Sequence, residues 1–170
     1  LLGVSYGTRA ALVYARLFPQ HVRTLVLDSV VPPGWALGES IDDDAYRALD
    51  LIFTRCDQSP ACSATFPEIA GQFSALRDRL STEPAVVNLD HPTSGEPVEV
   101  YLDAANLFTT LRLMSYNNET ASLIPLFIHQ ANTENALEPL AAQFVILTES
   151  LGASIADGMN LSVLCSEDFP

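Results

Sequence analysis

Basic residues are scarce in this chain of 170 residues, which has 8 Lys and Arg together against 21 Asp and Glu and a formal net charge of −13. A surface this acidic should repel phosphate backbones and anionic lipids. We therefore expect neither a nucleic acid nor a membrane as a partner. A substrate with a cationic group fits the charge better, although the acidity also suits the solubility of a secreted or periplasmic protein.

The chain also lacks a run of about 18 apolar residues, so no membrane-spanning helix is expected. No signal peptide is recognisable, and the sequence opens on Leu1 rather than on Met. From this opening we expect a piece of a longer protein that begins inside a strand. The hydrophobic share of 48% is high enough for a packed core and argues against disorder.

Cysteine is rare as well, with three in the chain. Cys56 and Cys62 are separated by five residues that include Pro60. A loop of this length permits a disulfide, which would indicate an oxidising, extracellular or periplasmic compartment; two unbridged structural thiols are the alternative. The spacing is not that of a zinc site and no second ligand pair follows, so we expect no metal and no cofactor. Cys165 is left without an assigned partner.

Residues 1–33 have the pattern of one strand–helix–strand unit. An apolar strand should end at Val4, a helix should run from Tyr6 to Phe18 until Pro19 stops it, and a buried strand should cover residues 24–28. Such a connection between parallel strands is normally right-handed. The fold class expected from this unit is α/β.

The strand–helix alternation stops after Pro33. Residues 34–160 should form a mostly helical cap, and residues 161–170 should return to the first architecture through a strand over residues 161–165. Asp103 is a plausible N-cap for one of the helices. Helices are expected over residues 41–54, 67–80, 103–116, 119–132 and 136–150, and a hairpin should pair residues 86–89 with 98–102.

The run Gly3-Val4-Ser5-Tyr6-Gly7 falls between the first strand and the first helix. This is the setting of a nucleophile elbow, in which a serine stands on a strained turn with its hydroxyl exposed and flanking glycines avoid clashes. Ser5 is the candidate nucleophile. The backbone N–H of Tyr6 should donate to the oxyanion, and the helix N-terminus should favour the developing negative charge. A Gly/Ser turn in another kind of βαβ protein is the alternative.

The elbow and several other segments resemble the secreted tripeptidyl aminopeptidase and prolyl iminopeptidase branch of the serine α/β-hydrolases. The resemblance rests on residues 3–9, 14–19, 22–33 and 163–168 and on the Cys56/Cys62 pair. It implies a partial α/β-hydrolase core with a helical cap insertion. It also implies an exopeptidase that releases short N-terminal peptides or proline through an acyl-enzyme. An esterase with the same elbow and a non-catalytic binding module remain alternatives.

An aminopeptidase must bind the ammonium of a small peptide substrate with a free N-terminus. Glu167 and Asp168 are candidates for this role, because carboxylates bind ammonium groups through charge-assisted hydrogen bonds. A solvated loop pair is the other interpretation.

A serine triad also needs a histidine base and an acid that orients it, and in this fold both follow the serine in the chain. None of His21, His91 and His129 follows an acid on a core strand. We therefore expect the base and the acid to lie outside these residues, and the chain alone to be inactive.

Overall fold

The computed structural model describes residues 1–36, 38 and 40–168. Two compact units are distinguished by their internal contacts. The first combines Leu1–Ser40 with Gly158–Pro170, and the second is Ile41–Asp157. The described residues are mostly helical, and they include two small sheets of two strands each.

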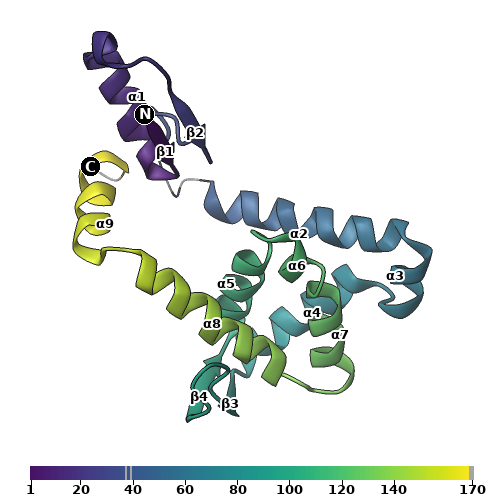
Figure 1. Cartoon of the computed structure of the whole chain (residues 1–170). Coiled ribbons are helices and arrows are strands. Elements are labelled where there is room, and N and C mark those ends of the chain that lie inside the picture. Colours follow the sequence, from purple (N-terminus) through teal and green to yellow (C-terminus); the bar gives the residue numbers. More distant parts are fainter. Residues whose placement is uncertain (37, 39, 169–170) are drawn as a thin grey trace. The chain divides into compact units, whose positions relative to one another are not determined.

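The first unit begins with the expected strand–helix–strand arrangement (Figure 1). The prediction that its second strand is buried is wrong, because Val26 and Asp28 are exposed. Strand β1 (Leu2–Val4) leads into helix α1 (Tyr6–Leu17), and strand β2 (Val26–Asp28) follows a short 3-10 turn, η1 (Pro19–His21). The two strands pair in parallel, with Gly3 opposite Leu27. Because parallel strands end at the same edge of a sheet, the residues after β1 and β2 lie next to each other there.

The strand expected over residues 161–165 is wrong. Helix α9 (Asp157–Val163) continues into a π-helical segment, η2 (Leu164–Asp168). A short apolar run cannot be assigned to a strand or a helix from its sequence alone. Here the chain satisfies its polar groups locally, since the hydroxyl of Ser162 donates to the carbonyl of Gly158 at 2.8 Å.

The second unit is a helical bundle with one hairpin. The expected hairpin is confirmed as an antiparallel pair in which Val87 lies opposite Val100. Asp103 is confirmed as the N-cap of a helix, because its carboxylate oxygen accepts the backbone N–H of Asn106 at 2.8 Å. The elements are α2 (Ile41–Gln58), α3 (Pro60–Thr65), α4 (Ile69–Thr82), β3 (Ala85–Asp90), β4 (Pro97–Leu102), α5 (Ala104–Met114), α6 (Asn118–Ala121), α7 (Ile124–Thr133) and α8 (Glu138–Ser154).

One buried apolar cluster holds this second unit together. It receives side chains from α2, α4, α5, α7, α8 and the hairpin, and the apolar residues of α4 recur at the spacing of one helix face. Its most deeply buried members include Leu49, Leu76, Leu107, Ile128 and Leu140. Burial of a side chain of this size contributes about 1.5–3 kcal/mol, so the cluster is the main source of stability for this unit.

Several helix boundaries in the second unit differ from expectation, and a proline explains two of the differences. The helix expected over residues 119–132 is divided into α6 and α7, and the segment after Pro60, expected as a loop, is helix α3. Pro125 and Pro60 both lie in the first turn of their helices. Proline suits that place because its fixed φ matches a helix and its missing N–H would have no partner there.

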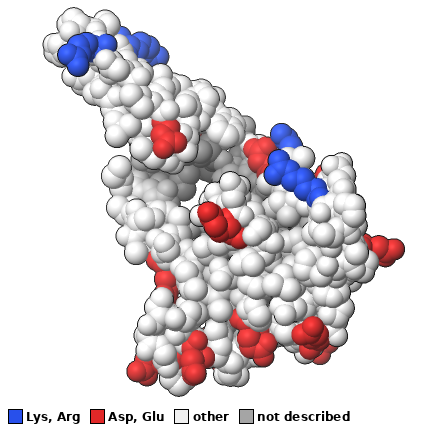
Figure 2. Space-filling model, turned by 45° about the vertical axis from the view of Figure 1, so that its right-hand side comes forward, with Lys and Arg blue, Asp and Glu red and all other residues white. Residues whose placement is uncertain are grey.

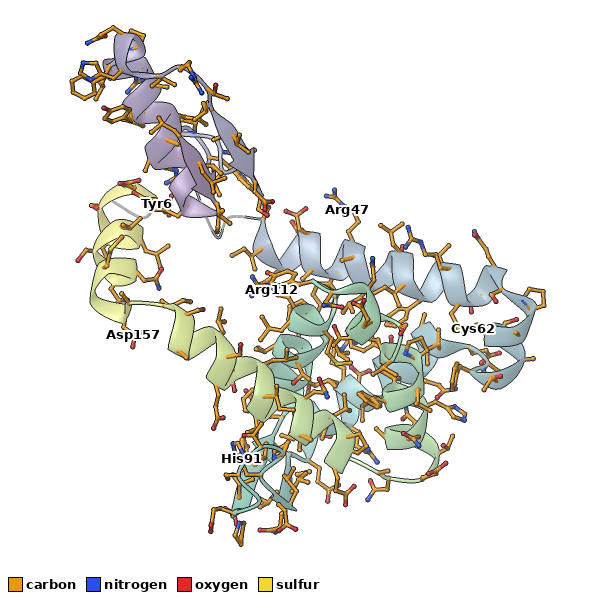
Figure 3. The ribbon with its side chains drawn as sticks, in the orientation of Figure 1. Tyr6, Arg47, Cys62, His91, Arg112 and Asp157 are labelled. Carbon is orange, nitrogen blue, oxygen red and sulfur yellow. A yellow bond between two sulfur atoms is a disulfide. The ribbon has the colours of Figure 1, made fainter. Side chains whose placement is uncertain are left out.

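Cys56 and Cys62 are joined by a disulfide. The bond links the end of α2 to α3, where Figure 3 marks Cys62. Cys56 belongs to the buried apolar cluster, whereas Cys165 is a free, exposed thiol.

Acidic side chains are spread across the face shown in Figure 2 rather than gathered in a single patch. Within the described parts of the chain, no group of three or more His, Cys, Asp or Glu side chains is placed to hold a metal ion. No single helix there is long and apolar enough to cross a membrane. The pair Glu138–Ser154 and Asp157–Asp168 reaches that length and composition only jointly, with a break between the two helices.

Candidate active site

Ser5 occupies a strained turn between β1 and α1. Its φ of 53° and ψ of −126° lie in a region that residues with a side chain rarely adopt. The N–H of Ser5 donates to the carbonyl of Asp28 at 3.0 Å, and its own carbonyl accepts the N–H of Thr8 at 2.9 Å. These bonds hold the turn on both sides, so the backbone keeps this conformation while the residue remains exposed.

Thr8 is a supporting residue that the sequence analysis did not single out. It is fully buried. Its hydroxyl donates to the carbonyl of Ser5 at 2.7 Å and accepts the N–H of Val31 at 2.8 Å. Thr8 therefore ties the serine turn to the segment that follows β2.

The two glycines of the motif have different roles. A Cβ atom on Gly3 would lie 2.6 Å from the carbonyl oxygen of Gly7, a distance that real Cβ atoms do not reach. A Cβ atom on Gly7 would meet no atom of the described residues within 4 Å. The expectation that glycine avoids a clash is thus confirmed at Gly3 and wrong at Gly7.

Gly3→Ala should therefore destabilise the protein, whereas Gly7→Ala should not. We expect Gly3→Ala to lower the free energy of unfolding by about 1–3 kcal/mol, because overpacking against backbone atoms costs this much. Gly7 lies inside α1, where alanine is favoured over glycine by up to about 1 kcal/mol. Urea denaturation of the two variants measures both effects, and equal losses would contradict the close approach at Gly3.

Tyr6 is the first residue of α1. The first N–H groups of a helix have no partner within the helix and point toward its N-terminal end. The N–H of Tyr6 is therefore placed directly after Ser5, at the positive end of a helix of 12 residues.

Glu167 and Asp168 come together with α1 in the first unit. The hydroxyl of Tyr6 donates to Glu167 Oε1 at 2.8 Å. Nη1 of Arg9 donates to Asp168 Oδ1 at 2.9 Å and to Glu167 Oε2 at 3.2 Å, and its Nη2 donates to the carbonyl of Trp35. Figure 3 marks Tyr6 at the start of α1, beside the segment that carries the two carboxylates.

The two carboxylates have different environments. The side chain of Asp168 is 0% exposed and that of Glu167 is 41% exposed. Asp168 is thus held as a buried partner of Arg9, whereas Glu167 has a face open to solvent. Sequence reasoning missed Arg9, and the local signal for it was an arginine among small residues four positions after Ser5.

The hydrogen bond to Glu167 raises the pKa of the Tyr6 phenol, and burial and the negative charge of Glu167 act in the same direction. The folded state therefore favours the neutral phenol. This contribution to stability is complete below the ordinary tyrosine pKa of about 10 and is lost as the pH rises through the higher folded value. The hydrogen bond to Asp168 likewise raises the pKa of Arg9, which stays positively charged.

His21 lies at the far end of α1 from Ser5. Its Nδ1 is 3.5 Å from the hydroxyl of Tyr14, and its ring stacks on Phe18 with centroids 6.0 Å apart. A helix of this length separates its ends by about 18 Å. His21 is therefore not placed to take a proton from Ser5.

The other two histidines belong to the second unit and have partners there. Nε2 of His91 is 3.0 Å from a carboxylate oxygen of Glu149, at the hairpin turn marked in Figure 3. Nδ1 of His129 is 3.0 Å from the side-chain oxygen of Gln72. Both contacts are local to the helical bundle.

A short stretch of the chain is similar to known peptidases. Over 32 residues it is 66% identical to proteins named tripeptidyl aminopeptidase from Streptomyces lividans and Streptomyces coelicolor. The matched stretch covers 19% of this chain and only 6% of the length of each relative. No family model and no solved structure matches the chain. The similarity indicates a relationship to a peptidase.

Proposed function

We propose that the whole protein is a serine peptidase of the aminopeptidase type, in which Ser5 is the nucleophile. The observation that carries this proposal is the turn of Ser5, which is strained, held by hydrogen bonds on both sides and followed at once by a helix N-terminus. The local similarity to tripeptidyl aminopeptidases supports a peptide as the substrate.

In the proposed reaction, Ser5 Oγ bonds to the carbonyl carbon of the scissile amide and its proton passes to a histidine base. The oxyanion accepts the N–H of Tyr6, and one such donor is worth about 3 kcal/mol of transition-state stabilisation. The base returns the proton to the leaving amine, and water then hydrolyses the acyl-enzyme. We assign the base and its acid to residues of the whole protein other than the three histidines described above.

We propose that Glu167 binds the ammonium of the substrate N-terminus. Its partly exposed carboxylate lies within hydrogen-bond distance of Tyr6, the residue next to Ser5. Asp168 would support it from the buried side. In this proposal the helical unit Ile41–Asp157 acts as the cap that admits short peptides, and the products are short N-terminal peptides or proline.

We also propose a secreted or periplasmic location. Support comes from the Cys56–Cys62 bond, because disulfides persist in oxidising compartments and are rare in the cytosol.

The amine site predicts a preference for substrates with a free N-terminus. The whole protein should hydrolyse the p-nitroanilide of trialanine with a higher kcat/KM than its N-acetylated form. Glu167→Gln should reduce this preference about tenfold or more, because a hydrogen bond to a charged group is worth about 1.5–3 kcal/mol. Turnover of both chromogenic substrates measures the ratio.

Glu149→Gln is the matched control, since Glu149 pairs with His91 in the second unit and should not change the preference. Equal turnover of free and acetylated substrates by the wild type would remove the amine site. Hydrolysis of esters without hydrolysis of amides would indicate an esterase instead.

A further inference from the structure

Arg9 carries a buried charge near the N-terminal end of α1, only 4% exposed. Burial of this charge and its position near the start of a helix are each unfavourable by themselves. A cation opposes the dipole at the start of a helix, and a buried charge is costly unless it is paired and hydrogen-bonded. The arrangement around Arg9 must therefore supply compensating negative charge.

The guanidinium connects three segments of the first unit. Nη1 contacts both carboxylates of η2, Nη2 donates to the carbonyl of Trp35, and the group lies 5.7 Å from the ring centroid of Tyr6 on its own helix. The guanidinium presents two nitrogens in one fixed plane, Nη1 to the carboxylates and Nη2 to the carbonyl of Trp35, whereas lysine has a single nitrogen on a flexible stem.

The charges of this cluster do not cancel. One guanidinium faces two carboxylates, and its shorter contact, at 2.9 Å, is with Asp168, whose side chain is fully buried. The contact with Glu167 is longer, at 3.2 Å, and Glu167 is the exposed member. The excess negative charge therefore falls on Glu167, where a ligand can reach it.

We propose that Arg9 is a positioning residue that fixes Glu167 and leaves the site one negative charge, matched to the single ammonium of a peptide N-terminus. This inference rests on the proposed function, because it concerns the amine site of that reaction. In this proposal Arg9, which is 4% exposed, acts on the carboxylates and not on the substrate or the reacting atoms. It acts by neutralising Asp168 and by holding η2 against α1.

Binding to an inactive protein tests the inference without requiring turnover. In the whole protein carrying Ser5→Ala, isothermal titration with trialanine amide and its N-acetylated form gives the ratio of the two Kd values. Arg9→Lys in this background should reduce the preference for the free amine about tenfold, since lysine lacks the second nitrogen that is bonded to the carbonyl of Trp35 and its ammonium is not held in a fixed plane. Asp168→Asn should reduce it similarly, because Arg9 then pairs with Glu167 and the net charge becomes zero.

Arg23→Lys is the matched control, since Arg23 is an exposed arginine of the first unit outside α1 and η2, and it should keep the wild-type ratio. If Arg9 were only structural, its loss would weaken both ligands equally, and an unchanged ratio in Arg9→Lys and Asp168→Asn would overturn the inference. Failure of the proposed function would look different, because the wild type would then show no Ser5-dependent hydrolysis while these binding ratios could still be measured.

Discussion

Ser5→Ala should lower kcat for peptide hydrolysis by the whole protein by about 10⁴-fold or more, with little change in KM. Loss of the nucleophile of a serine triad has effects of this order, because the base and the oxyanion donors act only through it. The turn of Ser5 remains held through Asp28 and Thr8 in the variant, so the loss would reflect the missing hydroxyl. Initial rates on a tripeptide p-nitroanilide, with labelling by a fluorophosphonate probe, measure it.

Ser29→Ala provides a matched control for this substitution. Ser29 also has a positive φ, of 56°, is exposed, and follows β2 as Ser5 follows β1. We expect it to keep at least a third of the wild-type kcat and to retain probe labelling. Residual labelling or turnover near the wild-type level in Ser5→Ala would exclude Ser5 as the nucleophile.

Arg9→Met should cause the largest loss of stability among the substitutions considered. It removes the cation that pairs with Asp168 and leaves a buried carboxylate without its counter-charge. Breaking a buried pair in this way typically costs about 3–5 kcal/mol. Thermal and urea unfolding of the whole protein measure the loss.

Arg16→Met is the control for Arg9→Met, and the change at this exposed position should stay within about 0.5 kcal/mol. Adding Asp168→Leu to Arg9→Met should recover part of the loss, because replacing a buried ion pair by apolar groups is often nearly neutral. A loss below about 1 kcal/mol in Arg9→Met would show that the pair is not buried in solution.

Patterns within short stretches of sequence predicted those helices, strands and caps that depend on residues close together in the chain. Ile69, Phe73, Leu76 and Leu80 recur at helical spacing, and this face of α4 is buried as expected. The hairpin and the helix N-cap at Asp103 also depend on residues that are close together in the sequence. In such segments the spacing of side chains decides both the element and the face that it buries.

Two features could not be predicted. One is a contact between residues far apart in the sequence, and the other is an apolar segment whose pattern fits both a strand and a helix. Arg9 and Asp168 are 159 positions apart, so no local pattern reveals that they pair. The apolar run over residues 161–165 fits a strand and a helix equally well, and the structure makes it part of α9 and η2. Local patterns thus indicated Ser5 and Glu167 as candidates, whereas no local pattern indicated the contacts of Arg9 with Glu167 and Asp168.

The buried apolar cluster lies wholly within Ile41–Asp157, and Ser5 belongs to the other unit. The packing of this cluster and the proposed bond-making step at Ser5 therefore depend on different sets of residues. A protein arranged in this way can accumulate stabilising core substitutions around Leu76 or Leu107 without altering the strained turn. In many proteins, changes that stabilise the fold also hinder catalysis. For substitutions in this cluster we expect that conflict to be weak.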